Sequence, residues 1–191
     1  MQKKENIFIL SGVLFVIAAV VALLLASVNM LTKDTILQNT EREKLQARQM
    51  VLSQAESFHE LTEVYPAGIT SVYAGEKDNK TVGYCVQVSQ NGFGGLIDMM
   101  VGVLPNGEIA GVTIVSMSET PGLGAKTQEE SFLGQFIGQS GGASLNLVKG
   151  SKASDEEIVA VSGATISSAA VRDGVYAARE TVQLIKRRAH R

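Results

Sequence analysis

Cysteine, histidine and tryptophan are scarce in this 191-residue chain, which has one, two and none of them. A single cysteine, Cys85, excludes an internal disulfide, and we expect it to be a small residue within a strand. Neither Cys85 nor His59 or His190 has a partner at the spacing of metal ligands, so we expect no metal site. Two isolated histidines also give no Ser-His-Asp arrangement, and the sequence predicts no catalytic residue.

An excess of charge of one sign is also lacking. The 17 basic and 19 acidic side chains leave a net charge of −2, and no long basic run occurs. Nucleic-acid-binding domains carry a basic face or stripe, so we expect no nucleic-acid partner. At this length the chain has room for one anchor and one domain, with enough apolar content to form a core.

Residues 7–28 carry no charge and are dominated by Ile, Leu, Val, Ala and Phe. As a helix this run would extend about 33 Å, enough to cross the hydrocarbon core of a bilayer. A cleaved signal peptide is the alternative. The apolar region of a signal peptide is typically shorter than this run and ends in a small-x-small cleavage site, which this sequence fits poorly, so we favour an uncleaved anchor. Lys3 and Lys4 precede the run, which favours a cytoplasmic tail at 1–6 and a domain outside, although basic residues also follow it.

The segment 29–60 is polar and rich in Glu, Arg, Gln and Lys, and its apolar residues form only a loose stripe. Thr35 is a candidate cap for a helix that begins at Ile36. We therefore expect a stalk helix that joins the membrane to a domain at 61–191. A mostly solvated linker is the alternative.

Strand patterns begin at Ile69. Residues 82–89 alternate between apolar and small or polar side chains, which predicts a strand buried on one face. Two further strands, 96–104 and 109–117, flank Asn106-Gly107, a strong hairpin signal because both residues tolerate positive φ. Consecutive strands followed by helices predict an α+β fold, with an antiparallel sheet flanked by helices.

Two glycine-rich loops interrupt the sheet, at 91–95 and 119–124. In the second loop a proline and two glycines fix the backbone for a close approach to a planar ring or a phosphate, while Glu119 and Thr120 offer polar contacts. The alternative is a rigid turn before a short amphipathic helix over Gln128–Ile137.

Residues 158–161 form a short apolar run that predicts a buried strand, and a helix pattern follows. Its apolar positions recur at spacings of four and three residues, at Val171, Val175, Ala178, Val182 and Ile185. The residues between strand and helix are mostly hydroxylic or small, and they crowd a helix N-terminus, whose unpaired N–H groups attract a phosphate. The hydroxyl of Thr165 is able to carry one covalently, whereas ordinary capping by Ser and Thr is the alternative.

The motif Ser162-Gly163-Ala164-Thr165-Ile166-Ser167-Ser168 resembles the flavinylation motif of the FMN-binding domain family. That domain is shared by the G subunit of the Rnf electron-transport complex and the C subunit of the sodium-pumping NADH:quinone reductase. The loop at 119–124 is similar to the family's Glu-Thr-Pro-Gly-Leu-Gly loop at every position, and 91–95 resembles its Gly-aromatic-Gly-Gly turn. The short length of the chain fits the Rnf component better.

The resemblance implies that FMN is held through a phosphoester bond to Thr165, installed by a separate flavin transferase. The family usually has an aspartate six residues before this threonine, where this chain has Val159. The sequence leaves open how Val159 affects flavinylation and whether Lys149 and Arg172 approach the phosphate. The other cofactor contacts that the resemblance and the loops imply are Ser162, Gly163, Ala164, Ser167, Ser168, Glu119, Thr120, Gly122, Leu123, Gly124, Gly94 and Gly95.

The function implied by the resemblance is a relay, in which FMN receives electrons from one redox centre of a membrane complex and passes them to another. The complex would be an ion-translocating ferredoxin:NAD oxidoreductase in the cytoplasmic membrane, with the flavin domain on the outer face. Without a dinucleotide-binding glycine pattern or a general acid or base, the chain alone is not expected to oxidise NADH. The alternatives are the C-type subunit of the quinone reductase and a flavin-free membrane-tethered scaffold.

Overall fold

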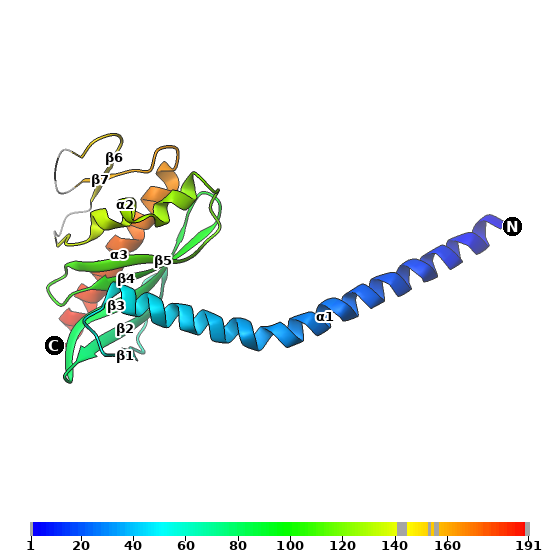
Figure 1. Ribbon diagram of the computed structural model, residues 1–191, viewed down its shortest axis with the longest axis horizontal. Coiled ribbons are helices and arrows are strands. Elements are labelled where there is room, and N and C mark those ends of the chain that lie inside the picture. The colour runs from blue at the N-terminus through cyan, green and yellow to red at the C-terminus, as the bar shows by residue number, and fades with distance from the viewer. Residues whose placement is uncertain (1, 141–144, 153, 155–156, 190–191) are drawn as a thin grey trace. The chain divides into compact units, whose positions relative to one another are not determined.

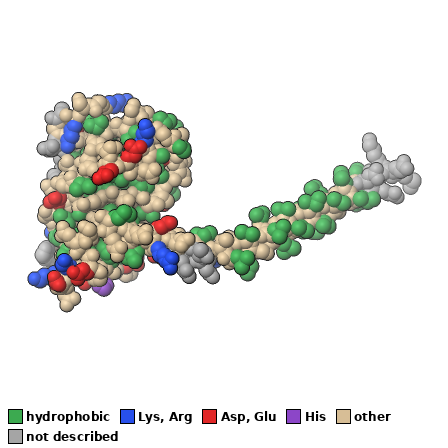
Figure 2. Space-filling view, in the orientation of Figure 1, with side chains coloured by type: hydrophobic (Ala, Val, Ile, Leu, Met, Phe, Trp, Pro, Cys, Tyr) green, Lys and Arg blue, Asp and Glu red, His purple; other side chains and the backbone are tan. Residues whose placement is uncertain are grey.

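The first helix, α1, runs from Gln2 to Val51 in a computed structural model that describes residues 2–140, 145–152, 154 and 157–189 (Figure 1). His190 lies outside the described residues. The chain divides into two compact units, Met1–Glu43 and Lys44–Arg191. Within the first unit, Ile7–Lys33 is long and apolar enough to cross a membrane. Figure 2 shows apolar side chains along this segment, and they are exposed rather than packed in a protein core.

Helix α1 continues without a break through the segment in which the sequence predicts a new helix at Ile36. That prediction is wrong, because neither glycine nor proline occurs between Val28 and Val51 to end the first helix. The second compact unit begins at Lys44, whereas the sequence places the start of the domain at residue 61. The last turns of α1 therefore belong to the folded domain.

Five strands form an antiparallel sheet in which each strand pairs with the next along the chain, and this confirms the expected fold class. The tight turn before the third strand has Asp78 and Asn79 at φ of 50° and 58°. In the predicted hairpin at Asn106-Gly107, by contrast, only Gly107 has a positive φ, of 90°. The strands are β1 (Ser57–Glu60), β2 (Ile69–Lys77), β3 (Lys80–Asn91), β4 (Leu96–Val103) and β5 (Ile109–Met117).

One face of the sheet packs against the long helix α3, Thr165–Ala189. The apolar stripe predicted for this helix is confirmed, since its five members are between 0% and 7% exposed. They contact the inward side chains of the strands, among them Val86, Met99 and Val101, each 0% exposed. This larger core fixes the position of the N-terminus of α3 relative to the strand ends.

The other face of the sheet is covered by the end of α1. Ala47, Val51 and Leu52 form a second cluster with Cys85 and Met100, all nearly fully buried. The sequence predicts a strand at 82–89 that is buried on one face only, and that prediction is wrong because α1 covers the second face. Burial raises the pKa of the Cys85 thiol to about 12, so this cysteine is a packed strand residue, as expected, and not a reactive thiolate.

We predict that Leu52→Ala destabilises the domain by about 2–3 kcal/mol, because it removes a fully buried side chain and leaves a cavity against the sheet. Met50→Ala, a change two residues earlier at a side chain that is 67% exposed, serves as the control. Urea unfolding of the full chain, followed by tyrosine fluorescence, measures both. Equal stability losses in the two variants would contradict the packing of α1 on the sheet.

Short elements connect β5 to α3. The predicted helix over Gln128–Ile137 is replaced by three short pieces, and the extended backbone of Glu129, with φ −70° and ψ 145°, separates the first piece from the second. The predicted strands around 145–148 and 158–161 are present, and they pair in parallel as a second, two-stranded sheet. The elements are η1 (Gly124–Gln128), α2 (Glu130–Leu133), η2 (Gly134–Phe136), β6 (Asn146–Val148) and β7 (Glu157–Val159).

Candidate functional site

Both glycine-rich loops and the N-terminus of α3 lie at the same end of the domain. Strands β3 and β5 run in the same direction because β4 between them is antiparallel to both, so the loops after Asn91 and Met117 leave the same edge of the sheet. A cavity of about 500 Å³ lies there. Its lining consists of Phe93, Glu119, Thr120, Leu123, Gly124, Lys149, Gly150 and residues 160–167.

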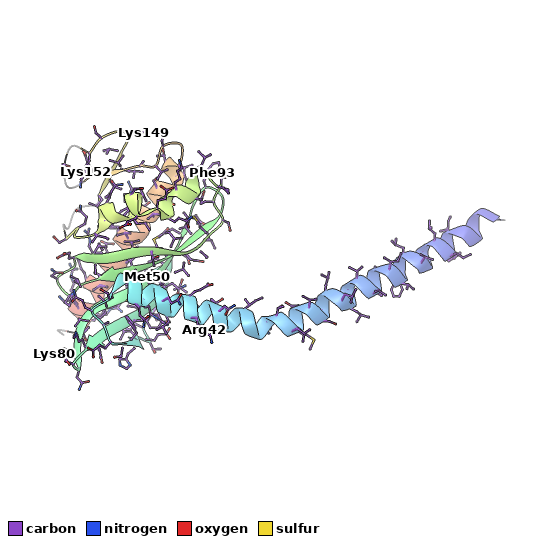
Figure 3. All side chains as sticks on the ribbon, viewed as in Figure 1. Arg42, Met50, Lys80, Phe93, Lys149 and Lys152 are labelled. Carbon is purple, nitrogen blue, oxygen red and sulfur yellow. The ribbon has the colours of Figure 1, made fainter. Side chains whose placement is uncertain are left out.

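The cavity has the size and lining of a small-molecule site, since such sites span roughly 300–1,000 Å³ and combine apolar walls with a few polar groups. Figure 3 shows Phe93 and Lys149 at this end of the domain and Lys80 at the opposite end. Lys149 is exposed, and it contributes a basic side chain to the lining of the cavity. A ligand with an apolar ring and an anionic group would match these surroundings.

The N-terminus of α3 presents one hydroxyl to solvent and the cavity. Thr165 is the first residue of the helix, and its side chain is exposed. The turn before it depends on Gly163, whose φ of 77° and distance of 3.2 Å from its ideal Cβ position to Leu123 Cδ2 both favour glycine. Ser168 Oγ accepts a hydrogen bond from Val161 N at 3.0 Å and closes the turn. Thr165 is thus accessible from solvent.

Ser167 presents a buried hydroxyl that lacks a partner. Its side chain is 1% exposed and lines the cavity, and within the described part of the chain its Oγ makes no hydrogen bond. An unsatisfied buried hydroxyl costs about 1–3 kcal/mol, so it is expected where a ligand supplies the missing partner. The residues present therefore fit an anionic nucleotide group at the positive end of α3.

Glu119 lines the cavity, but one of its oxygens is already engaged. Oε1 accepts hydrogen bonds from Phe93 N at 2.7 Å and from Gly94 N at 3.1 Å. The sequence predicts a polar contact from Glu119 to a cofactor, whereas the contact observed ties the two glycine-rich loops together. This contact between Glu119 and the 91–95 loop depends on the sheet, because the sheet brings two loops that are distant in sequence to the same edge.

Other predicted residues lie outside the lining. Arg172 donates from Nε and Nη2 to Asp173 Oδ1 at 2.9 and 2.7 Å and lines a different hollow. Gly94, Gly95, Gly122 and Ser168 support the loops or the turn, but they are not among the residues around the cavity. Sequence reasoning missed the role of Phe93 as a lining residue, although the aromatic within a glycine-rich turn was a visible signal.

Val159, where the family usually has aspartate, is held by its backbone. Gln135 Oε1 accepts from Val159 N at 2.8 Å, and Gln135 Nε2 donates to Val159 O at 3.2 Å. Both hydrogen bonds involve main-chain atoms of Val159, so they do not require a particular side chain at this position.

Comparison with known proteins assigns the domain to a class. A model of the FMN-binding domain family matches residues 92–180, which contain the 119–124 loop, the 91–95 loop except its first residue, and the start of α3. A model of the RnfG N-terminal region matches residues 1–51. The fold and the site thus define an FMN-binding domain.

Two relatives that are similar to this chain along nearly their whole length show which family of FMN-binding proteins it belongs to. The G subunit of the proton-translocating ferredoxin:NAD(+) oxidoreductase complex of Clostridium ljungdahlii is 34% identical over 181 residues, which are 95% of this chain and 94% of the relative. The G subunit of the Na(+)-translocating ferredoxin:NAD(+) oxidoreductase complex of Acetobacterium woodii is 36% identical, over 92% of this chain and 94% of the relative. The chain belongs to this family of G subunits of Rnf ion-translocating oxidoreductase complexes.

Solved structures support the fold. NqrC of Shewanella oneidensis aligns with a TM-score of 0.52 and 25% identity over 61% of this chain and 60% of that chain. The C subunit of the Na(+)-translocating NADH-quinone reductase of Parabacteroides distasonis aligns with a TM-score of 0.54 and 19% identity, over 74% of this chain and 91% of that chain. The second likeness concerns the fold alone.

Proposed function

We propose that this chain is a membrane-anchored flavoprotein subunit that relays electrons through FMN attached to Thr165 in an ion-translocating ferredoxin:NAD oxidoreductase complex. The observation that carries the proposal is the exposed hydroxyl of Thr165 at the head of α3, beside a cavity with an unpartnered buried hydroxyl at Ser167. A flavin accepts and donates electrons singly or in pairs, and the protein supplies its position and surroundings.

Each side of the cavity has a separate task in this proposal. The N–H groups at the start of α3 and the ammonium of Lys149 attract the phosphate, and Ser167 Oγ donates to an acceptor atom of the nucleotide. Phe93, Leu123 and Ile166, which are 74%, 48% and 56% exposed, offer apolar surface for the ring. Covalent attachment would prevent loss of the cofactor to the medium.

The partners are the other subunits of the membrane complex. In the proposed arrangement residues 1–6 are a cytoplasmic tail, 7–28 span the membrane, and the flavin domain lies on the outer face. The relatives support this complex over the C-type subunit of a quinone reductase, because the two G subunits are 34% and 36% identical to this chain, whereas the two C-subunit structures are 25% and 19% identical to it. The two Rnf relatives differ in their coupling ion, so the proposal names none.

A flavin transferase and an activated flavin nucleotide are required for the attachment. The bond between Thr165 Oγ1 and phosphorus forms as a pyrophosphate bond of the donor breaks, the other nucleotide half leaves, and the hydroxyl loses its proton. Intact mass of the chain with and without transferase, followed by peptide mapping, tests this step. An FMN adduct on the Thr165 peptide is expected, and an unmodified mass in the native complex would overturn the proposal.

We predict that Ser167→Ala acts in opposite directions on the two forms of the protein. Without flavin the variant is more stable by about 1 kcal/mol, because a buried unsatisfied hydroxyl is removed. With flavin attached, the stabilisation due to the cofactor falls by about 1 kcal/mol, because a hydrogen bond is lost. Unfolding midpoints of both forms measure the two effects.

Ser168→Ala is the matched control, since it changes the same residue type at the next position. Its hydroxyl accepts from Val161 N, so the flavin-free variant is expected to lose about 1–2 kcal/mol. If Ser167→Ala destabilised the flavin-free chain as much as Ser168→Ala does, Ser167 would have a structural partner and not a ligand.

A further inference from the structure

The side chain of Glu119 joins the two loops at the mouth of the cavity. Its Oε1 accepts from two successive backbone N–H groups, of Phe93 and Gly94, at 2.7 and 3.1 Å. Hydrogen bonds to an ionised acceptor are roughly twice as strong as neutral ones. One carboxylate therefore fixes the backbone from which the Phe93 ring projects, and we refer to Glu119 with these two N–H groups as the Glu119 latch.

The glycines of both loops make room for the latch. An ideal Cβ on Gly92 would lie 2.2 Å from Glu119 Oε1, and one on Gly124 would lie 2.1 Å from Glu119 Oε2. A Cβ on Gly94 would lie 2.3 Å from the carbonyl oxygen of Ser118, the residue before Glu119. Contacts this short do not occur, so a side chain at any of the three positions would displace the carboxylate or the loop. Glycine at these positions is thus explained by the carboxylate and the neighbouring backbone.

The ring of Phe93 lines the cavity yet is packed into neither apolar cluster of the described residues. It is 74% exposed, an unusual state for a phenyl ring on a backbone held this firmly. Leu123 and Ile166, also partly exposed, line the same cavity from other elements. Apolar side chains held apart around a cavity suit a flat aromatic ligand between them.

We propose that Glu119 is a positioning residue: its carboxylate holds the 91–95 loop so that the phenyl ring of Phe93 forms one wall against the flavin ring. That the ligand is a flavin rests on the proposed function, whereas the Glu119 latch itself is inferred from hydrogen bonds within the domain. Glu119 acts through the backbone, so its effect on the flavin should pass entirely through Phe93.

Hydrogen exchange of the flavin-free full chain tests the latch itself. Glu119→Ala is expected to speed exchange of the Phe93 and Gly94 amides by about tenfold or more, because both lose a charge-assisted acceptor. Glu119→Gln retains an acceptor oxygen and should restore most of the protection. Phe93→Ala keeps the N–H group of residue 93 and should leave exchange unchanged. Glu129→Ala, which removes an exposed carboxylate ten residues further along the chain, should also leave it unchanged. Unchanged exchange in Glu119→Ala would overturn the latch.

Collisional quenching of flavin fluorescence by iodide tests the wall in the flavinylated full chain. Phe93→Ala should raise the quenching constant about twofold, because the face of the flavin ring that Phe93 covers becomes open to iodide. Glu119→Ala should raise the quenching constant by the same factor, and Glu119→Gln should keep a value near that of wild type. The Glu119→Ala/Phe93→Ala double variant should have the same quenching constant as either single variant. Additive effects, or no effect of Phe93→Ala, would overturn the wall. A wild-type chain that takes up no flavin would overturn the proposed function and the wall together, while the exchange data would still decide the latch.

Discussion

Thr165→Ala is expected to abolish covalent flavin completely, because a phosphoester needs the threonine oxygen and alanine has none. The domain should still fold with a stability within about 0.5 kcal/mol of wild type, since the side chain is exposed at the first position of α3. In-gel flavin fluorescence after denaturation, together with the intact mass, measures the loss. Co-expression with a flavin transferase is required in every sample.

Two matched variants control this experiment. Thr165→Ser keeps a hydroxyl at the same place and should retain covalent flavin. Ser131→Ala removes an exposed hydroxyl from a residue outside the lining of the cavity and should also retain it. If Thr165→Ala folded and still carried covalent flavin, the attachment site would lie elsewhere and the role of the α3 N-terminus would have to be reassigned.

Gly102→Ala is expected to destabilise the domain by about 3–5 kcal/mol. The ideal Cβ would lie 2.1 Å from the carbonyl oxygen of Val51, which is a backbone atom and has no alternative rotamer. The end of α1 must then move off the sheet, and Val51 and Leu52, each about 2% exposed or less, lose their burial. Urea unfolding of the flavin-free full chain by tyrosine fluorescence reports this loss.

Gly134→Ala is the matched control for that substitution. Nothing lies within 4 Å of its Cβ position, and its backbone is right-handed helical at φ −61° and ψ −22°, so alanine fits and should be neutral or stabilise by up to about 1 kcal/mol. A Gly102→Ala chain as stable as the Gly134→Ala chain would mean that α1 and the sheet are not in close contact in solution.

The parts of the site that were predictable from sequence are those built from neighbours along the chain. Ser162 to Ser168 lie within one turn and the start of one helix, so local spacing was enough to place Thr165 at a helix N-terminus. The partnership of Glu119 with Phe93 was not predictable, because 26 residues separate them and the contact depends on the register of β3, β4 and β5. Arg172 remained open for the same reason, since only the packing of α3 decides which way its side chain points.

By itself the sequence determined the apolar run near the N-terminus, the antiparallel strands and the amphipathic helix α3, because each depends on a local repeat of side chains with period 2 or 3.6, or on an uninterrupted apolar run. Tertiary structure alone decided that the end of α1 joins the domain. Ala47, Val51 and the following Leu52 form too sparse a stripe to predict burial. Glycines on four separate strands, Gly75, Gly83, Gly102 and Gly111, leave the space that Val51 and Leu52 occupy on the sheet. A local sequence pattern shows which face of a helix or strand is apolar. Which element packs on that face depends on the shape of the sheet surface, and that surface forms only when the strands have paired.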